Sequence, residues 1–468
     1  MKWQLWKVSD LAESIGASWW GEDIILPDFF TADSREVRPG AAFVAIRGNA
    51  EDGHDYIKDA LHQGASLIIA EKGRIPQGLS IRDRAVIEVN DSVVDLARMA
   101  SAYLSACLPD EVIAITGSVG KTTTREVLKK CFEGMPLVFG AEKSFNTLIG
   151  CSLTILAMPA GTNVLILEMG TNKPGEIEEM VQYFPPTRCI ITEVSSAHLE
   201  GLVTLEGVIA AKMEITRSPH LKTLIFNADN ENLANAAGQV YGTCKKIGVG
   251  VRKGEVRICQ STFDLVENLP RLKTTIRWED GVISDLYCGL WGTHNSLSLV
   301  YALTLYRELG YPLEEALRNL ETMTSLPGRG RVFSTRAGAV IIDDSYNANP
   351  SSMKASLNTF STVEVKGRKL AILGSMKELG KEESVLHEEI LRSTHFLDAL
   401  FLVGEEWKVP LEKMPEHERS KIVIVSKVQS FAVELAKMIR SGDGVLIKGS
   451  HSHHLEKVVL ILMEGQES

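Results

Sequence analysis

The sequence predicts an α/β protein of about three domains, and three observations lead to this fold class. The chain has 468 residues, which is too long for a single hydrophobic core. Short, continuous apolar runs alternate with helical segments, a pattern typical of parallel strands that are covered on both faces. Turn-rich segments near residues 107 and 326 divide these runs into three series.

Residues 1–107 predict a small mixed α/β domain. Its apolar runs, AAFVAI, ASLIIA and AVIEV, are short and are separated by turn-rich segments. The boundary with the next domain is expected near the sequence CLPDE.

Residues 108–325 predict a central domain of the P-loop ATPase type, built on a parallel sheet. Strand-like apolar runs recur with helical segments between them, at 112–116, 164–169, 189–194 and 223–227. Between 255 and 290 the pattern becomes alternating around Asp280 and Gly281, which indicates a hairpin. We therefore expect a β excursion within the same domain.

Residues 326–468 predict a third domain, with a Rossmann-like α/β fold. After SLPGRG a second α/β series begins, whose strand-like runs are AVIIDD, KLAILG, ALFLVG, KIVIV and GVLIKG.

Composition limits the class of protein. The net charge of −10 argues against a general nucleic-acid binder, which needs a basic surface. The seven cysteines include no C-x-x-C pair, so neither a disulfide framework nor a zinc site is indicated. No run of 18 apolar residues occurs, and charges interrupt the first residues too early for a signal peptide. We expect a cytoplasmic protein without a membrane span, and nothing in the sequence demands more than a monomer.

The stretch IAITGSVGKTTTREVLKKC, residues 113–131, predicts a phosphate-binding loop. A strand, a glycine-rich turn and a helix would aim backbone N–H groups and the positive helix end at one anion. Lysine adds a charge for the β and γ phosphates, and a threonine hydroxyl can bind magnesium. The alternative is a tight turn that happens to contain lysine. The loop residues expected to bind ATP are Gly117, Ser118, Val119, Gly120, Lys121, Thr122 and Thr123.

Two further residues follow neighbouring strands of the same predicted sheet. Glu168 closes the run VLILE, where a lone carboxylate would be badly desolvated without a cation. His198 follows the next strand, and a histidine there is more often structural than a ligand. Because ligands collect at the carboxyl ends of parallel strands, Lys121, Glu168 and His198 should share one edge of the sheet.

The loop TGSVGKT resembles that of the ATP-dependent Mur ligases of peptidoglycan synthesis and of their relative folylpolyglutamate synthetase. Its late first glycine matches the pattern T-G-[ST]-x-G-K-[TS] of this family. The segments at 341–353 and 372–380 are similar to those of the member that adds D-alanyl-D-alanine. The segment 32–57 is similar to the uridine-nucleotide segment of ligases that act late in peptide extension. The resemblance covers nearly the whole chain.

This resemblance implies an activity and its partners. The implied reaction joins D-Ala-D-Ala to UDP-N-acetylmuramoyl-tripeptide, with ATP as substrate, an acyl-phosphate intermediate and two Mg²⁺ ions. Lys212 matches a lysine that is carbamylated in this family, giving N6-carboxylysine, an anion that can bind a hard metal. Carbamylation requires the lysine to lose its proton, which burial favours. Without the family, a lysine on a helix surface would be the simpler interpretation.

The resemblance also implies roles for individual residues. The implied magnesium ligands are Thr122, Glu168, His198 and carbamylated Lys212, and the implied catalytic residues are Lys121, Lys212, His198 and Arg329. Further positions that match ATP-binding residues are Asn146, His294, Asn295, Arg329, Asp344, Tyr346, Asn347 and Asn349. Ser34 and Arg35 match contacts to the uridine nucleotide, although Arg35 is equally suited to a surface ion pair.

Several positions depart from the family pattern. An asparagine-rich segment is reduced to Ser144, Asn146 and Thr147, and the residues before His198 are serine, serine and alanine. Ser375 stands where aspartate is usual, and His451 where arginine is usual. A histidine would grip a carboxylate less firmly than arginine at neutral pH. These changes spare the phosphate side and affect the substrate side.

Other functions remain open on the sequence alone. One is a sister ligase that adds the third amino acid, which the segment DDSYNANP disfavours. A second is folylpolyglutamate synthetase, which has no use for the uridine segment. The others are a P-loop ATPase switch that ligates nothing, and a paralogue that binds uridine nucleotides without catalysis.

Overall fold

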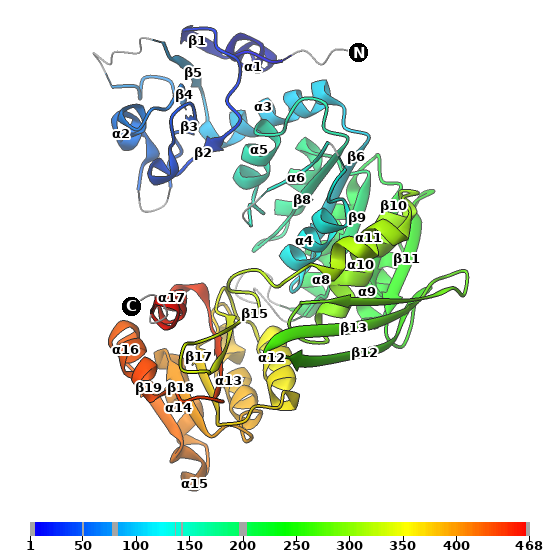
Figure 1. The fold of residues 1–468 in the computed structure, drawn as a ribbon. Coiled ribbons are helices and arrows are strands. Elements are labelled where there is room, and N and C mark those ends of the chain that lie inside the picture. Colours follow the sequence, from blue (N-terminus) through cyan, green and yellow to red (C-terminus); the bar gives the residue numbers. More distant parts are fainter. Residues whose placement is uncertain are drawn as a thin grey trace.

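The computed structural model describes residues 5–48, 51–76, 83–135, 137–141, 144–195 and 204–464. Within these ranges the chain forms three sheets in series, of five, nine and six strands, with helices packed on them. The predicted α/β class is therefore confirmed (Figure 1). Each predicted domain contains one of the sheets, and the boundaries at 107 and 325 stay predictions.

The N-terminal sheet has the strand order β1-β5-β4-β3-β2. It is mixed, because β1 pairs with β5 antiparallel while the other strands run parallel. Its strands are β1 (Ser18–Gly21), β2 (Phe30–Thr31), β3 (Ala42–Val44), β4 (Leu67–Glu71) and β5 (Ala85–Val89). Its helices are α1 (Val8–Ile15), α2 (Ile57–His62) and α3 (Ser92–Cys107).

The middle sheet has the order β14-β13-β12-β11-β10-β9-β6-β8-β7 and is parallel from β7 to β12. The parallel strands are β6 (Glu111–Thr116), β7 (Val138–Gly140), β8 (Val164–Glu168), β9 (Arg188–Ile191), β10 (Thr223–Asn227), β11 (Lys245–Gly250) and β12 (Val256–Val266). The predicted β excursion is present as β13 (Leu269–Arg277) and β14 (Ile283–Cys288), which extend the sheet antiparallel.

Helices cover both faces of the middle sheet. They are α4 (Lys121–Cys131), α5 (Leu148–Leu156), α6 (Glu176–Tyr183), α8 (Leu205–Met213), α9 (Glu231–Gly238), α10 (Asn295–Glu308) and α11 (Leu313–Glu321). One core cluster joins α5, α6 and α8 to one face, and another joins α4, α10 and α11 to the opposite face. All of the parallel strands therefore end at one sheet edge between two helical layers.

The C-terminal sheet has the order β15-β16-β20-β17-β18-β19, with β15 antiparallel to its neighbour. Its strands are β15 (Arg331–Ser334), β16 (Val340–Asp344), β17 (Lys369–Gly374), β18 (Ala399–Val403), β19 (Ile422–Val425) and β20 (Gly444–Lys448). Its helices are α12 (Pro350–Thr362), α13 (Glu383–Arg392), α14 (Lys408–Glu412), α15 (Glu416–Arg419), α16 (Val428–Met438) and α17 (Glu456–Glu464).

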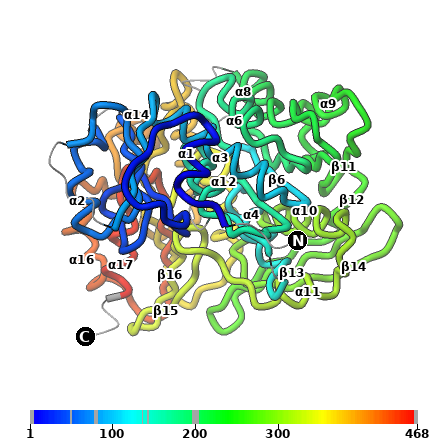
Figure 2. Tube along the Cα trace, turned by 90° about the horizontal axis from the view of Figure 1, so that it is seen from above, coloured from blue at the N-terminus to red at the C-terminus, as the bar shows by residue number. Residues whose placement is uncertain are grey.

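The N- and C-terminal parts lie on the same side of the middle sheet. Figure 1 shows both to one side of it, and the view from above in Figure 2 agrees. Helix α3 joins the first two parts, because it packs on the N-terminal sheet and also against α5 and α6. Its start is fixed by Asp91, whose side chain accepts hydrogen bonds from the N–H groups of Val93 and Val94.

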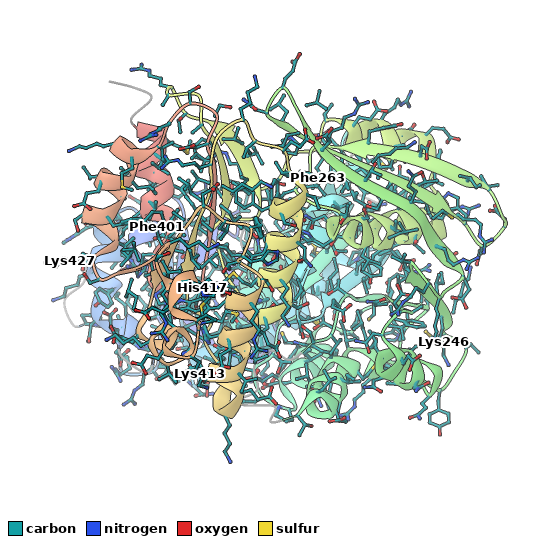
Figure 3. The ribbon with its side chains drawn as sticks, turned by 90° about the horizontal axis from the view of Figure 1, so that it is seen from below. Lys246, Phe263, Phe401, Lys413, His417 and Lys427 are labelled. Atoms are coloured by element: carbon teal, nitrogen blue, oxygen red, sulfur yellow. The ribbon has the colours of Figure 1, made fainter. Side chains whose placement is uncertain are left out.

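The hairpin of β12 and β13 reaches from the middle sheet to the C-terminal part. Phe263 and Leu265 on β12 pack on the C-terminal core, and the ring of Phe263 meets Trp291 edge-on at 5.0 Å. Figure 3 shows Phe263 beside the helix α12. The hairpin of β12 and β13 therefore supports the third domain as well as extending the sheet.

No helix within the described ranges combines the length and the apolar character that crossing a membrane would need.

We predict that Tyr103 on α3 contributes measurably to the joint between the first two parts. Its buried hydroxyl donates to the Met158 carbonyl at 2.8 Å, so Tyr103→Phe leaves that carbonyl without this donor. The free energy of the first unfolding transition in urea should fall by about 1–2 kcal/mol. Tyr241→Phe is the matched control, because Tyr241 is 96% exposed. Equal midpoints for the two variants would contradict the assignment.

Candidate active site

The loop between β6 and α4 has a backbone that only glycine suits at two positions. Gly117 has φ +144°, and a Cβ there would lie 1.9 Å from Thr192 Oγ1. Gly120, which precedes the first residue of α4, has φ +88°. The loop therefore follows β9 closely and turns directly into the helix, so that the amino end of α4 opens on the same side as the loop.

Hydrogen bonds from the neighbouring strand end hold this loop in place. Ser118 N donates to the Glu193 carbonyl at 2.7 Å, and Thr192 Oγ1 donates to the Val119 carbonyl at 2.7 Å. Lys121 Nζ donates to the Gly117 carbonyl at 2.7 Å. The predicted phosphate loop is thus preformed, with its lysine folded over it. Burial and the charge of Arg329 lower the pKa of Lys121, and Glu168 opposes them.

Glu168 lies at the end of β8 beside this loop, and its side chain is 2% exposed. Thr122 Oγ1 donates to Glu168 Oε2 at 2.9 Å, and Asn146 Nδ2 donates to Oε1 at 3.3 Å. The buried guanidinium of Arg125 lies 3.4 Å from Oε2. The cation that the sequence pattern requires beside this buried carboxylate is therefore supplied in part by the protein itself, through Arg125.

The oxygen atoms around Glu168 suit a magnesium ion. Thr122 Oγ1 lies 3.1 Å from Ser144 Oγ and 2.9 Å from Glu168, which gathers two hydroxyls and a carboxylate. Among the described residues, however, no group of three His, Cys, Asp or Glu side chains could hold a metal. An ion here would need further oxygen ligands, and nucleotide phosphates are suited to supply them.

Lys212 on α8 is completely buried, which excludes the alternative of a lysine on the helix surface. Its Nζ has no hydrogen-bond partner among the described residues. Burial and the positive charge of Lys121 lower the pKa of Lys212 well below its usual value, against the charges of Glu176, Glu214 and Glu168. Burial without a partner favours the neutral amine, which is the form that reacts with carbon dioxide.

The third domain contributes to the site through residues around β16 and β20. Arg329 Nη2 donates to Ser144 Oγ at 3.2 Å, and its guanidinium lies 4.1 Å from the ring centroid of Tyr346. Lys448, at the end of β20, is 2.8 Å from Asp344 and donates to the Asn347 carbonyl at 3.1 Å. The middle and third domains therefore meet through polar contacts at the predicted edge.

A cleft of about 510 Å³ opens between these two domains. Its walls bring together most of the residues predicted for ATP binding, in one place and from both domains. The predicted residues that line it are Ser118, Val119, Gly120, Lys121, Thr122, Thr123, Asn146, Glu168, His294, Asn295, Arg329, Asp344, Tyr346, Asn347 and Asn349.

Some of these lining residues also have structural roles. Asn349 caps the first turn of α12, accepting from Ser352 N at 2.8 Å, and Asn295 Nδ2 donates to the Trp291 carbonyl at 2.6 Å. His294 stands in the wall of the cleft, where burial and Lys448 lower its pKa to about 4 against the charge of Asp344. Its ring is therefore neutral at physiological pH.

The other predicted site residues lie elsewhere. Gly117 does not line the cleft but allows the loop to pass close to Thr192. Lys212 is buried, and the charges of Lys121 and Glu168 act on it. Ser34 and Arg35 belong to the N-terminal domain, where Arg35 pairs with Asp33 at 2.6 Å, so the surface ion pair left open above is present. His198 lies outside the described residues.

Sequence reasoning missed several residues of the cleft or its support. Arg125, three positions after Thr122 on α4, is one, and Ser144 and Glu193 are others. Lys448 and Lys377 could have been found, because both follow strands whose carboxyl ends face the cleft, the same signal that singled out Glu168. Arg125 gave no such signal.

Three models of the Mur ligase family match this chain. The Mur ligase family catalytic domain matches residues 28–104, the Mur ligase middle domain matches 115–305, and the Mur ligase glutamate ligase domain matches 328–451.

Similar proteins match over almost the full length. The UDP-N-acetylmuramoyl-tripeptide–D-alanyl-D-alanine ligase of Rickettsia prowazekii is 31% identical, over 91% of this chain and 93% of that protein. The ligase of the same name from Bacillus subtilis is 29% identical, over 92% of each chain. The MurF ligase from Thermotoga maritima, solved in complex with ADP, is 29% identical with a TM-score of 0.75, over 94% of this chain and 98% of that one.

A fourth similarity concerns the fold alone. MurF from Acinetobacter baumannii superposes with a TM-score of 0.82 over 99% of this chain and 100% of that one, at 23% identity. Because the sequence similarity and the fold agree from the first domain to the third, the chain belongs to the Mur ligase family.

Proposed function

We propose that this protein is the ATP-dependent ligase that joins D-alanyl-D-alanine to UDP-N-acetylmuramoyl-tripeptide. The observation that carries the proposal is the near full-length similarity, at 29–31% identity, to ligases named for this reaction. The preformed phosphate loop beside Glu168, in a cleft between two domains, is the geometry that such a reaction requires.

The first step activates a carboxylate, which is a poor electrophile because of its charge and resonance. The terminal phosphoryl group of ATP passes to a carboxylate oxygen, which gives an acyl phosphate and ADP. In our proposal the loop N–H groups and the amino end of α4 bind the phosphates. The Lys121 side chain leaves its hydrogen bond to the Gly117 carbonyl and neutralises charge on the transferring phosphoryl group.

Magnesium fits the oxygen cluster of Thr122, Ser144 and Glu168, and when bound it would neutralise phosphate charge. We propose that Lys212, once carbamylated, would add a carboxylate-like ligand for such an ion, and that His198 would be a further ligand, as the family resemblance implies. Arg125 would keep the Glu168 carboxylate oriented. The family resemblance implies two magnesium ions in this site.

The second step consumes the acyl phosphate. The neutral amine of the dipeptide attacks the acyl carbon, the amine loses a proton, and the tetrahedral intermediate expels phosphate to leave an amide. Water competes for the same acyl phosphate, so the site must be closed during the reaction. Arg329 and Tyr346 join the third domain to the phosphate side and would serve this closure.

The first domain would hold the uridine nucleotide, with Ser34 and Arg35 among its contacts. The substrate would then extend across the joint toward the cleft of the middle domain, on the side where the first and third domains both lie. Because ATP and UDP-linked precursors are cytoplasmic solutes, we propose that the protein acts in the cytoplasm.

The test of this function is ADP release with each substrate left out in turn. ADP should form only when ATP, UDP-N-acetylmuramoyl-tripeptide and D-Ala-D-Ala are all present, in equal amount to the amide product. An ATPase switch would instead release ADP without the dipeptide. A ligase for the third amino acid would use the UDP-dipeptide precursor.

We predict that Lys121→Ala lowers kcat at least ~100-fold, because the transferring phosphoryl group loses its positioned cation. Lys130→Ala is the matched control, since Lys130 lies on the same helix but pairs with Glu133 on the surface. Its kcat should stay within about twofold. Retention of most turnover in Lys121→Ala would refute the assignment.

A separate prediction concerns carbamylation of Lys212. With ¹³C-labelled bicarbonate, a carbamate signal should appear by NMR and should be absent in Lys212→Arg. Because the pKa of Lys212 is lowered, the neutral amine should be available at lower pH than for an ordinary lysine, and the signal should weaken only as the pH falls through this lowered pKa. A signal that persists in Lys212→Arg would assign the carbamate to another amine.

A further inference from the structure

The α/β topology places a crevice in the third domain at the carboxyl ends of β17 and β20, which are parallel neighbours. The chain leaves β17 toward α13, which packs on one face of the sheet together with α12. It leaves β20 toward α17, which packs on the opposite face with α16. Adjacent strands whose connections go to opposite faces form the topological switch point of an α/β sheet, where ligands bind.

A chain of hydrogen bonds is built into this crevice. Ser375, the first residue after β17, is fully buried, and its Oγ lies 2.7 Å from Glu406 Oε2 and 2.6 Å from His453 Nε2. Because a carboxylate can only accept, Ser375 donates to Glu406. His453 Nε2–H must then donate to Ser375, which fixes the tautomer of the ring.

The hydrogen-bonded groups of Ser375 and Glu406 are closely packed against the backbone. Gly404, after β18, has φ +115°, and a Cβ there would lie 2.4 Å from Ser375 Oγ and 2.8 Å from Glu406 Oε2. The backbone therefore passes directly over the hydroxyl and the carboxylate. Such close packing is suited to hold a charged group at a fixed position.

The group that this chain holds is the ammonium of Lys377. Glu406 accepts a hydrogen bond from Lys377 Nζ through Oε1, while Oε2 faces Ser375. Burial alone would raise the pKa of Glu406, but the bonds from Lys377 and Ser375 outweigh it and lower the pKa to about 2. The Glu406 carboxylate, which anchors the Lys377 ammonium, is therefore ionised at physiological pH.

Lys377 itself remains open to the cleft. Its side chain is 41% exposed, and it lines the cleft that also contains the phosphate loop. Glu406 is its one hydrogen-bond partner among the described residues, so two of its three N–H bonds are available to a ligand.

The other cations along this cleft are already engaged. Lys121 and Arg329 serve the phosphate side, as described above, and Arg329 is also stacked on Tyr346. Lys448 is 3% exposed and is paired with Asp344. Lys377 is therefore the half-exposed cation that the third domain offers to a further anion.

We propose that Lys377, positioned by Glu406 and the Ser375–His453 pair, binds the free carboxylate of the amine-bearing substrate and selects for it. This inference rests on the proposed function, in which the acceptor is a dipeptide with an amine at one end and a carboxylate at the other. A carboxylate held at the third-domain wall would leave the amine directed toward the middle domain, where the acyl phosphate forms.

The experiment compares D-Ala-D-Ala with D-Ala-D-Ala carboxamide in the full-length enzyme, by product formation. The wild type should favour the acid by about 10- to 100-fold in kcat/KM, the range expected for charge-assisted hydrogen bonds. Lys377→Met should lose this preference, so that acid and amide react at similar kcat/KM. The KM values for ATP and for the UDP substrate should stay within about twofold.

Lys381→Met is the matched control. Lys381 is exposed and also follows β17, but it does not line the cleft. Its substitution by methionine removes the same positive charge as Lys377→Met. This variant should keep the wild-type preference for the acid. If the wild type does not distinguish acid from amide, or if Lys377→Met keeps the full preference, the inference is wrong while the ligase function stands. If no dipeptide is ligated by the wild type, both fail.

A second variant tests the positioning residues. Ser375→Ala removes the link between His453 and Glu406 without touching Lys377, and should raise the KM for the acid while kcat and the KM for the amide change little. A merely structural role would lower kcat for both substrates together. Equal losses for acid and amide would therefore overturn the positioning role.

Discussion

The burial of the Glu168 carboxylate is the interaction on which the geometry of the site depends. A carboxylate that is only 2% exposed is costly by several kcal/mol unless hydrogen bonds and a cation satisfy it. Its partners Thr122, Asn146 and Arg125 come from the start of α4, the segment before α5 and the next turn of α4. Satisfying this one group therefore fixes the phosphate loop, the neighbouring segment and the end of β8 relative to one another.

The same network extends into the third domain. Thr122 is 3.1 Å from Ser144, and Ser144 accepts from Arg329, which is stacked on Tyr346. The third domain is thus connected to the Glu168 carboxylate through two hydroxyls. On the opposite side of the joint, Phe263 of the long hairpin packs on the third-domain core. One contact is polar and the other is apolar, so a motion that opens the cleft can break the first while the second persists.

The strand-end rule predicted much of the site because parallel strands end at one edge whatever their sequence separation. It placed Lys121 and Glu168 together correctly, 47 positions apart in the chain, and the order of the strands confirmed the α/β fold class. Arg125 could not be found in this way. It is one of four cations along α4, and only packing against α10 and β8 shows that it is buried while Lys129 and Lys130 are not.

The departures at positions 375 and 451 can be understood in the same terms. Relative to the pattern that the family resemblance implies, serine removes a negative charge after β17 and histidine removes a positive charge after β20. In the structure the His451 ring meets the Tyr346 ring edge-on, with 5.7 Å between the ring centroids, and Arg329 lies over the same Tyr346 ring. Glu406 and Lys377 place one charge of each sign on loops after β18 and β17.

Glu406 and Lys377 therefore restore, within one crevice, one charge of each sign that serine at 375 and histidine at 451 remove. Because Ser375 is small, it leaves room for Glu406 to approach from the neighbouring strand, and Gly404 provides the close backbone passage that this approach needs. An aspartate at 375 would put a second carboxylate in contact with Glu406, and two carboxylates in contact there would not both ionise readily. Serine at 375 and glutamate at 406 thus depend on each other, which explains how the crevice keeps an ionised anchor for Lys377 without the usual aspartate.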